Sequence, residues 1–232
     1  MRRVVALLFL LVIVVGCSHE PPAYESHYTP PPPPPKTSAV AVIGDSYTGG
    51  SNEGGTREHG WPALVTTQLD RQGVPVRFDV GAVGGSGYVN RGPKNRVFAD
   101  EVPDVVHPGD RLVVFFGSRN DRGIDPAELG RAVQQALGSA KAIAPSAGLL
   151  VIGPPWVEGE PTPSILNVRD ALRTEAEAAG ATFVDPIAEG WFAGQPNLIG
   201  TDNVHPNDAG HVYMADKIAP VIAAQLQQPA TP

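Results

Sequence analysis

Short apolar runs alternate along residues 37–232 with longer segments in which apolar residues recur at helical spacing. The short runs are rich in Val, Ile and Leu, and several are continuously apolar, which is typical of strands in a sheet covered on both faces. The predicted strands are residues 39–43, 74–80, 111–116, 149–152 and 182–184, and the predicted helices are residues 61–69, 127–144, 165–178 and 208–225. This alternation predicts an α/β domain in which a parallel sheet lies between two helical layers.

Residues that favour helix ends stand at the expected places. Asp125 precedes Pro126 and Glu128, the order of N-cap, first-turn proline and capping-box acid at a helix start. Asn207 stands in the N-cap position of the last predicted helix, and Pro145 follows the end of the second. These residues set the predicted boundaries of two helices.

The N-terminal segment follows a different pattern. Arg2 and Arg3 precede a continuous apolar run at residues 4–15, which is typical of an export signal. As a helix this run would be about 18 Å long, which is too short to span a bilayer core. It ends at VVGC, which resembles a bacterial lipobox and implies cleavage before Cys17 and attachment of a diacylglycerol to its sulfur. A cleaved secretory signal and an uncleaved anchor are the alternatives.

Proline dominates the segment between this signal and the first predicted strand. Residues 18–36 include an uninterrupted run of six prolines at positions 30–35, which favours an extended polyproline II conformation. We therefore predict three parts: a signal segment with a lipobox at 1–17, a proline-rich tether at 18–36, and a folded domain at 37–232. The protein is expected to be exported and either held at the cell membrane through Cys17 or located in the cell wall or outside the cell.

Composition narrows the classes of function. The 232 residues are 42% hydrophobic, enough for one domain with a substantial core. Asp and Glu number 24 against 17 Lys and Arg, a formal charge of -7, and no basic cluster occurs that would neutralise phosphates. No nucleic-acid partner is expected. The single cysteine excludes a disulfide within the chain, which supports a separate use for Cys17.

Reactive residue types follow the predicted strands, at the sheet edge where parallel α/β folds hold their sites. The apolar run at 39–43 stops at Gly44-Asp45-Ser46, which would present the Ser46 hydroxyl at the mouth of the sheet. The glycine-rich residues 48–55 then predict a rim outside any regular element. The second predicted strand is followed by GAVGGSGY at 81–88, whose glycines can bring backbone N–H groups close to an anion or an oxyanion.

Two further segments, one at a strand end and one in a loop, also hold candidate reactive residues. FFGSRND ends the third strand, and the amide of Asn120 could donate to the same oxyanion. TDNVHPNDAGH holds Asp202 and His205, three positions apart, before the last helix. A serine nucleophile needs a base, and the base needs a carboxylate to orient it, so this loop could supply both. Half a metal site is the alternative use, although the other histidines show no ligand cluster, and no metal or cofactor is expected.

The four segments, in this order, resemble the SGNH or GDSL hydrolase family, and the resemblance covers residues 39–219. It implies a flavodoxin-like three-layer α/β/α sandwich in which Ser46 attacks an ester carbonyl, His205 acts as base and Asp202 orients it. It also implies an oxyanion hole formed by the backbone N–H groups of Ser46 and Gly85 and by the Asn120 side chain. The third motif departs from the family pattern because Gly117 stands one residue early, and Gly84 is an alternative to Gly85.

The resemblance leaves the substrate open. Tyr47, Tyr88 and Trp191 are near the motifs, where they could line an acyl or sugar pocket or simply contribute to packing. Hydrolysis of short- to medium-chain acyl esters or lipids at the cell envelope is the leading hypothesis. The alternatives are deacetylation or acyl transfer on envelope polysaccharide, and a non-catalytic envelope-binding lipoprotein that retains the hydrolase scaffold.

Overall fold

A computed structural model describes residues 36–228 of the chain. The predicted signal segment, Cys17 and all of the tether except Lys36 lie outside the described residues. The sheet consists of β1 (Ser38–Gly44), β2 (Val76–Ala82), β3 (Leu112–Phe116), β4 (Gly148–Ile152) and β5 (Thr182–Val184). All four pairings are parallel, in the order β2-β1-β3-β4-β5. This is the flavodoxin-like order, so the predicted fold class is confirmed.

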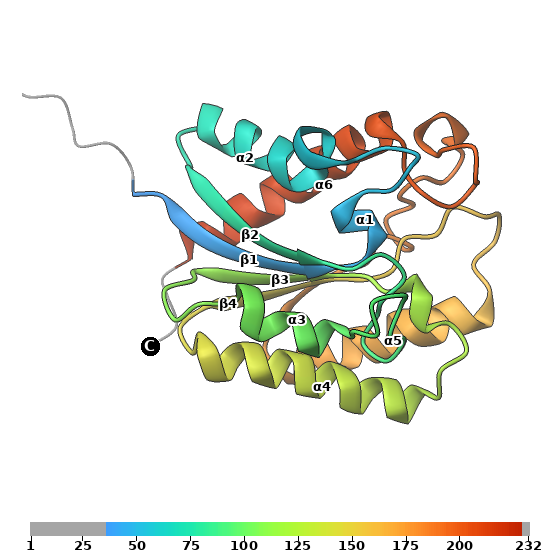
Figure 1. Cartoon of the computed structure of the whole chain (residues 1–232), viewed down its shortest axis with the longest axis horizontal. Helices are drawn as coiled ribbons and strands as arrows, with labels where there is room; N and C mark the ends of the chain where they lie inside the picture. Colours follow the sequence, from blue (N-terminus) through green and yellow to red (C-terminus); the bar gives the residue numbers. More distant parts are fainter. Residues whose placement is uncertain (1–35, 229–232) are drawn as a thin grey trace, which may run out of the picture. The chain divides into compact units, whose positions relative to one another are not determined.

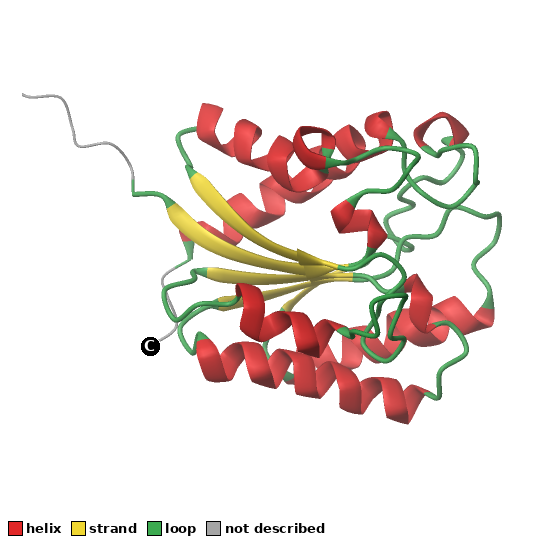
Figure 2. Cartoon of the chain, in the orientation of Figure 1, coloured by secondary structure: helices red, strands yellow, loops and turns green. Residues whose placement is uncertain are grey.

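Helices cover both faces of this sheet (Figure 1, Figure 2). The α-helices are α1 (Ser46–Gly49), α2 (Trp61–Arg71), α3 (Phe98–Val105), α4 (Pro126–Ile143), α5 (Pro163–Ala178) and α6 (Asp208–Gln227). In Figure 1, α2 and α6 lie above the sheet, and α3, α4 and α5 lie below it. Short 3-10 turns occur at Arg57–His59, Arg119–Asp121 and Pro196–Leu198. Among the described residues, no helix combines the length and apolar character needed to cross a bilayer.

Neighbouring residues of the central strands enter two different cores. Val40 and Val42 of β1 belong to the cluster that includes α2 and α6, whereas Ala41 and Ile43 belong to the cluster with α3, α4 and α5. All four are completely buried. Burial on both faces explains why the strand is continuously apolar rather than alternating.

Side-chain and backbone chemistry explains where α4 and α6 begin and why β2 begins later than predicted. Asp125 caps α4 by accepting hydrogen bonds from the N–H groups of Ala127 and Glu128, and Asn207 caps α6. The second strand begins at Val76 rather than at residue 74. Pro75 has no N–H to donate to the sheet, and its carbonyl accepts from Ser38 instead.

Two helices were not predicted. Pro103 lies inside α3 and disfavours a helix in the sequence, but Phe98 and Val102 on its inner face are fully buried, and this packing outweighs the propensity. The expectation that residues 48–55 lie outside any element is also wrong at its start, because Thr48 and Gly49 belong to α1. Gly44 must be glycine here, since a Cβ would lie 2.3 Å from the Thr48 hydroxyl oxygen.

Candidate active site

The turn that follows β1 holds Ser46 at the sheet edge. Asp45, which is 1% exposed, accepts a hydrogen bond on Oδ1 from the Tyr47 N–H at 2.9 Å. The Asp45 carbonyl accepts from the N–H groups of Thr48 and Gly49, so this residue begins α1 with both its side chain and its backbone. Ser46 is therefore the first residue of a short helix, and it lines a cavity at the strand ends.

The loop before α6 brings Asp202 and His205 to the same cavity edge. One Asp202 oxygen accepts from the backbone N–H groups of Val204 and His205, at 2.8 and 2.9 Å. The other lies 2.5 Å from His205 Nδ1, and His205 Nε2 lies 2.9 Å from Ser46 Oγ. If Nδ1 donates to the carboxylate, Nε2 is left to accept the serine proton. The structure thus brings together the three residues that the sequence suggested as a catalytic set.

The hydrogen bonds around Asp202 favour its charged form. Its side chain is 36% exposed. Desolvation acts to raise its pKa, but the hydrogen bonds from the His205 ring and from the backbone of His205 and Val204 outweigh it and lower the pKa to about 2. Asp202 is therefore a carboxylate at neutral pH, as a group that stabilises an imidazolium must be.

The loop after β2 brings two glycines to the cavity. Gly84 and Gly85 both line it, and a Cβ on Gly84 would lie 3.7 Å from the Ser46 Cβ. Gly85 has a positive φ of 78°, which disfavours any other residue. Among the hydrogen bonds of the described chain, none is donated by the backbone N–H of either glycine. Both groups are therefore available to a ligand, and the geometry does not favour Gly85 over Gly84.

Asn120 also lines the cavity, but its amide already has partners. Nδ2 donates to the Ser86 carbonyl at 2.8 Å and to Asp45 Oδ2 at 3.2 Å. An oxyanion would have to share or replace the longer of these bonds. The side chain is held in position by the loops after β1 and β2, so the sheet edge fixes its orientation before any ligand arrives.

Asp45 and Asp121 are two buried carboxylates whose structural role was missed in the sequence. Burial is the main cause that raises the pKa of Asp45 to about 7, with the nearby Asp121 charge adding to it. Burial also raises the pKa of Asp121, although its side chain accepts from the N–H groups of residues 88–90. Asp121 thereby ties the glycine loop to the turn that holds Asn120. Its place directly after Asn120 was the only signal in the sequence.

The cavity at Ser46 has a volume of about 750 Å³. Its lining combines the motif residues with polar, glycine and basic residues from five segments: Ser46, Tyr47, Gly50, Ser51, Asn52, Gly84, Gly85, Pro93, Arg119, Asn120, Arg122, Val204 and His205. Tyr47 is only 1% exposed, and its hydroxyl donates to the Val204 carbonyl. Burial raises the pKa of Tyr47 to about 12, so its hydroxyl stays protonated.

Two of the three aromatic candidates lie elsewhere, which corrects the expectation that they line the pocket. Tyr88 is buried under the sheet against Phe98, with ring centroids 4.8 Å apart. Trp191 packs edge-on against Phe116 in the opposite core and borders a separate cavity that it shares with Trp156. Tyr88 and Trp191 therefore contribute to core packing, which was the alternative to a place in the pocket at Ser46. The charged cavity residues that the sequence analysis missed are Arg119 and Arg122, which it showed only as neighbours of Asn120.

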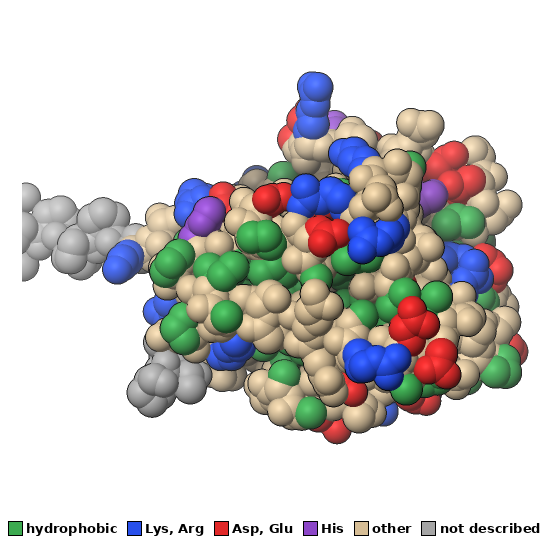
Figure 3. Space-filling model, turned by 60° about the horizontal axis from the view of Figure 1, so that its bottom comes forward, with side chains coloured by type: hydrophobic (Ala, Val, Ile, Leu, Met, Phe, Trp, Pro, Cys, Tyr) green, Lys and Arg blue, Asp and Glu red, His purple; other side chains and the backbone are tan. Residues whose placement is uncertain are grey.

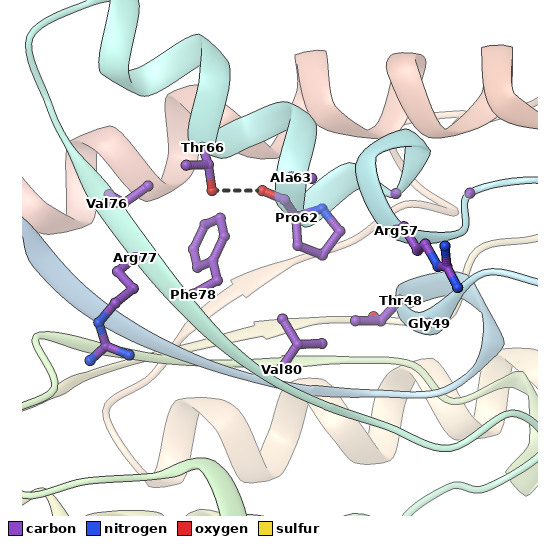
Figure 4. Close-up of a pocket in the computed structure, with 12 residues that line it drawn as sticks. Thr48, Gly49, Arg57, Pro62, Ala63, Thr66, Val76, Arg77, Phe78 and Val80 are labelled. Atoms are coloured by element: carbon purple, nitrogen blue, oxygen red, sulfur yellow. Dashed lines mark hydrogen bonds between the residues drawn. The ribbon is translucent and has the colours of Figure 1, made fainter.

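A different cavity, of about 480 Å³, lies between β2 and α2. Figure 4 shows Val76, Phe78 and Val80 facing Pro62 and Thr66 across it. No serine, histidine or carboxylate lines it. Within residues 36–228, no group of three or more His, Cys, Asp or Glu side chains is placed to hold a metal ion. Of these two cavities, the one at Ser46 is lined by a serine and a histidine, and the one between β2 and α2 is not.

A parallel sheet whose strand-end turns hold a Ser–His–Asp hydrogen-bond chain has the architecture of a serine hydrolase. The chain belongs to the GDSL-like lipase/acylhydrolase family, whose model matches residues 42–213. It is a GDSL-type serine ester hydrolase.

One curated relative agrees with the family assignment. The chain is 50% identical over 194 residues to "GDSL lipase Rv0518" of Mycobacterium tuberculosis (strain ATCC 25618 / H37Rv), a match that covers 82% of this chain and 84% of that protein. Two solved structures share the fold at low identity. TesA has a TM-score of 0.68 at 21% identity, over 81% of this chain and 99% of its own. Est24, a carbohydrate acetylesterase from Sinorhizobium meliloti, has a TM-score of 0.60 at 17% identity, over 81% and 99%.

Proposed function

We propose that this protein hydrolyses carboxylic esters with Ser46 as nucleophile, His205 as general base and acid, and Asp202 as the residue that orients the imidazole. The observation that carries the proposal is the continuous chain of hydrogen bonds from Asp202 Oδ2 through both His205 nitrogens to Ser46 Oγ, at 2.5 and 2.9 Å. A serine hydroxyl is a weak nucleophile unless a base takes its proton as it attacks.

The reaction would proceed in two halves. Ser46 Oγ bonds to the ester carbonyl carbon while His205 Nε2 accepts the hydroxyl proton, which gives a tetrahedral oxyanion. As the oxyanion collapses, the bond to the alcohol breaks and His205 returns the proton to the leaving oxygen, leaving an acyl-serine. Water then repeats these steps with the same base, releasing the carboxylic acid and restoring Ser46.

The oxyanion would lie between the backbone N–H of Ser46, the glycine loop and Asn120. Gly85 is the donor that the motif suggests, and Gly84 is equally available. Asn120 Nδ2 would shift its weaker 3.2 Å bond from Asp45 to the oxyanion while keeping its bond to Ser86. Within the described chain, the backbone N–H groups of Gly84 and Gly85 have no such bond to give up, so they can stabilise developing charge without a cost of reorganisation at that moment.

Short- to medium-chain acyl esters or lipids are the proposed substrates. A cavity of about 750 Å³ accommodates an acyl group and part of its alcohol. Deacetylation of envelope polysaccharide is the second candidate, supported by a structural neighbour described as a carbohydrate acetylesterase. Acyl transfer to a glycan would use the same acyl-serine, with a sugar hydroxyl in place of water.

Hydrolysis of p-nitrophenyl esters from acetate to palmitate by residues 37–232, with Ser46→Ala in parallel, tests the esterase proposal. We expect a maximum at short or medium chains that disappears in the variant. Turnover that persists in Ser46→Ala would contradict the assignment of the nucleophile. If no simple ester is cleaved, acetylated glycans with product analysis would separate deacetylation from acyl transfer.

We also propose that the protein is exported and anchored to the cell membrane by a lipid on Cys17. The support is the basic and apolar N-terminal pattern that ends at VVGC, together with the absence of another cysteine in the sequence. Cys17→Ser is expected to move the full chain from the membrane fraction to the soluble fraction. Equal membrane partition of variant and parent would rule out the lipid anchor.

A further inference from the structure

We propose that Arg122, held against Trp156 at the cavity that contains Ser46, is a specificity-determining residue that binds an anionic group of the ester substrate. The inference rests on the proposed ester hydrolysis and narrows its substrate to esters that carry a phosphate or carboxylate besides the reacting carbonyl. Guanidinium groups bind both anions through paired N–H donors.

The charge of the cavity differs from that of the whole chain. The protein carries a formal charge of -7, yet the charged side chains that line the cavity are Arg119 and Arg122, with His205 beside them. No Asp or Glu of the described chain is among the lining residues. On the face shown in Figure 3, basic and acidic side chains are interspersed. A cavity with one sign of charge attracts ligands of the opposite sign.

The two arginines differ in whether their guanidinium groups are already paired with other side chains. Arg119 is 5% exposed, and its Nη2 forms an ion pair with Glu158 Oε1 at 2.8 Å. Its guanidinium carbon lies 5.4 Å from the centre of the Trp156 ring, and the Trp156 indole N–H donates to the Glu158 carbonyl. These contacts fix Trp156 in place, and Glu158 balances the Arg119 charge. Arg119 is therefore a positioning residue for the indole.

In the described part of the chain, the charge of Arg122 is not paired with a carboxylate. It is exposed, and its guanidinium carbon lies 5.7 Å from the centre of the same Trp156 ring. Throughout residues 36–228, its side chain forms no ion pair and no hydrogen bond. This cation–π contact with a ring that is itself only 7% exposed holds the guanidinium near one position and leaves its N–H groups to a ligand.

The acidic residues near the site do not compete for Arg122. Asp202 is paired with His205, and Glu158 is paired with Arg119. An anion that arrives with the substrate therefore meets a cation without a carboxylate partner. The anion could lie on the alcohol part of the ester, as in an acylglycerol phosphate, or on the acyl part, as in a hemisuccinate.

Matched pairs of esters test this inference in wild type and Arg122→Gln. The first pair is a 1-acylglycerol 3-phosphate and the 1-acylglycerol with the same chain, and the second is p-nitrophenyl hemisuccinate and p-nitrophenyl butyrate. We expect wild type to favour the anionic member of at least one pair by about tenfold in kcat/KM, mainly through KM. The pair that shows the preference identifies the part of the substrate that Arg122 contacts.

Arg122→Gln should bring that ratio close to one, whereas Arg122→Lys should retain part of it because the charge remains but the paired N–H donors of the guanidinium are lost. Arg71→Gln is the matched control, since it removes one exposed arginine at the far end of α2 and should keep the wild-type ratio. Salt raised from about 0.05 M to about 0.5 M should reduce the preference of wild type but not that of Arg122→Gln.

Equal kcat/KM for both members of both pairs in wild type, or an unchanged ratio in Arg122→Gln, would overturn the inference while leaving Ser46-dependent hydrolysis of the neutral esters intact. If wild type hydrolyses none of these esters, the proposed function itself is contradicted. Hydrolysis of the neutral esters therefore distinguishes failure of the Arg122 inference from failure of the proposed function.

Discussion

Asp45 and Asp202 are carboxylates on either side of Ser46, and their surroundings are opposite. Asp45 is 1% exposed beneath the turn after β1, and burial raises its pKa to about 7. The Asp202 side chain is 36% exposed in the loop before α6, and despite some desolvation its hydrogen bonds to His205 and Val204 lower its pKa to about 2. The nucleophile is thus supported from within the core, whereas its base is supported by a loop at the surface.

Because of this difference, we expect changes near Asp202 and changes near Asp45 to affect catalysis and stability differently. Changes in the surface loop should damage turnover and leave the fold almost intact, because Asp202 and His205 are not part of either core cluster. Changes beneath Ser46 should alter stability and its pH dependence as well, because buried Asp45 accepts hydrogen bonds from Tyr47 in its own turn and from Asn120 in the loop after β3.

The largest expected effects are those of Ser46→Ala and His205→Ala. Each removes a reacting group, so we expect kcat/KM to fall by about 10⁴-fold or more while the melting temperature changes little. The double variant should be no worse than either single one, because the two residues act as a unit. Ser139→Ala and His107→Ala are controls outside the site. A double variant whose loss equals the product of both single losses would contradict a shared proton-transfer step.

Asp202→Asn should cost about a thousandfold in kcat. The amide can still accept from the N–H groups of Val204 and His205 through its oxygen, but its NH₂ would then face His205 Nδ1 and favour the wrong tautomer. Single-turnover kinetics with a p-nitrophenyl ester would measure the loss. Wild-type kcat in this variant would show that the loop backbone alone orients the imidazole.

Asn120→Ala should lower kcat by about a hundredfold, with KM less affected, because the amide would bind the oxyanion and not the ground state. Steady-state kinetics on the preferred ester would measure this, with Asn167→Ala on the exposed face of α5 as the control. A loss confined to KM would indicate that Asn120 binds the substrate and not the oxyanion.

The smallest expected effect is a change in stability with pH in Asp45→Asn. The folded-state pKa of Asp45 is raised to about 7, so the unfolded chain ionises first and wild-type stability falls as the pH rises from about 4 to about 7. Asparagine has no such charge to bury, although its NH₂ cannot accept the bond from Asn120 that Asp45 Oδ2 accepts. We therefore expect a melting temperature below that of wild type at pH 4, and a difference that moves in favour of the variant by about 10 °C between pH 4 and pH 8.

Melting temperatures measured from pH 4 to pH 8 would check this, with Asp202→Asn as the matched variant. The folded-state pKa of Asp202 is lowered to about 2, so its stabilising contribution is present above pH 4 and is lost only as the pH falls toward 2. Parallel profiles for wild type and Asp45→Asn would contradict the raised pKa of Asp45.

The sequence predicted the proposed catalytic residues and most of the regular elements. Ser46, Asp202 and His205 were predictable because each lies in a contiguous motif beside a strongly patterned element, and the parallel sheet brings strand ends to one edge. The five strands and four long helices followed from apolar spacing for the same reason. These features are local, so a single sequence displays them.

What the sequence did not show depends on contacts between distant segments. Asp121 binds backbone N–H groups 31 to 33 residues away, and no local pattern marks that pairing. Tyr88 and Trp191 lie in loops without a regular period, so their burial could not be distinguished from exposure in a pocket. Helix α3 forms despite Pro103 because the core covers its inner face, which only the folded structure shows.

Covalent labelling of the protein with a fluorophosphonate, followed by peptide mass spectrometry, tests the central claim most directly. A serine activated by His205 loses its proton as it displaces fluoride from phosphorus, so we predict a single adduct on Ser46 that forms rapidly in wild type and slows by orders of magnitude in His205→Ala. An adduct that maps to another serine, or a labelling rate that is unchanged in His205→Ala, would contradict the assignment of Ser46 and His205.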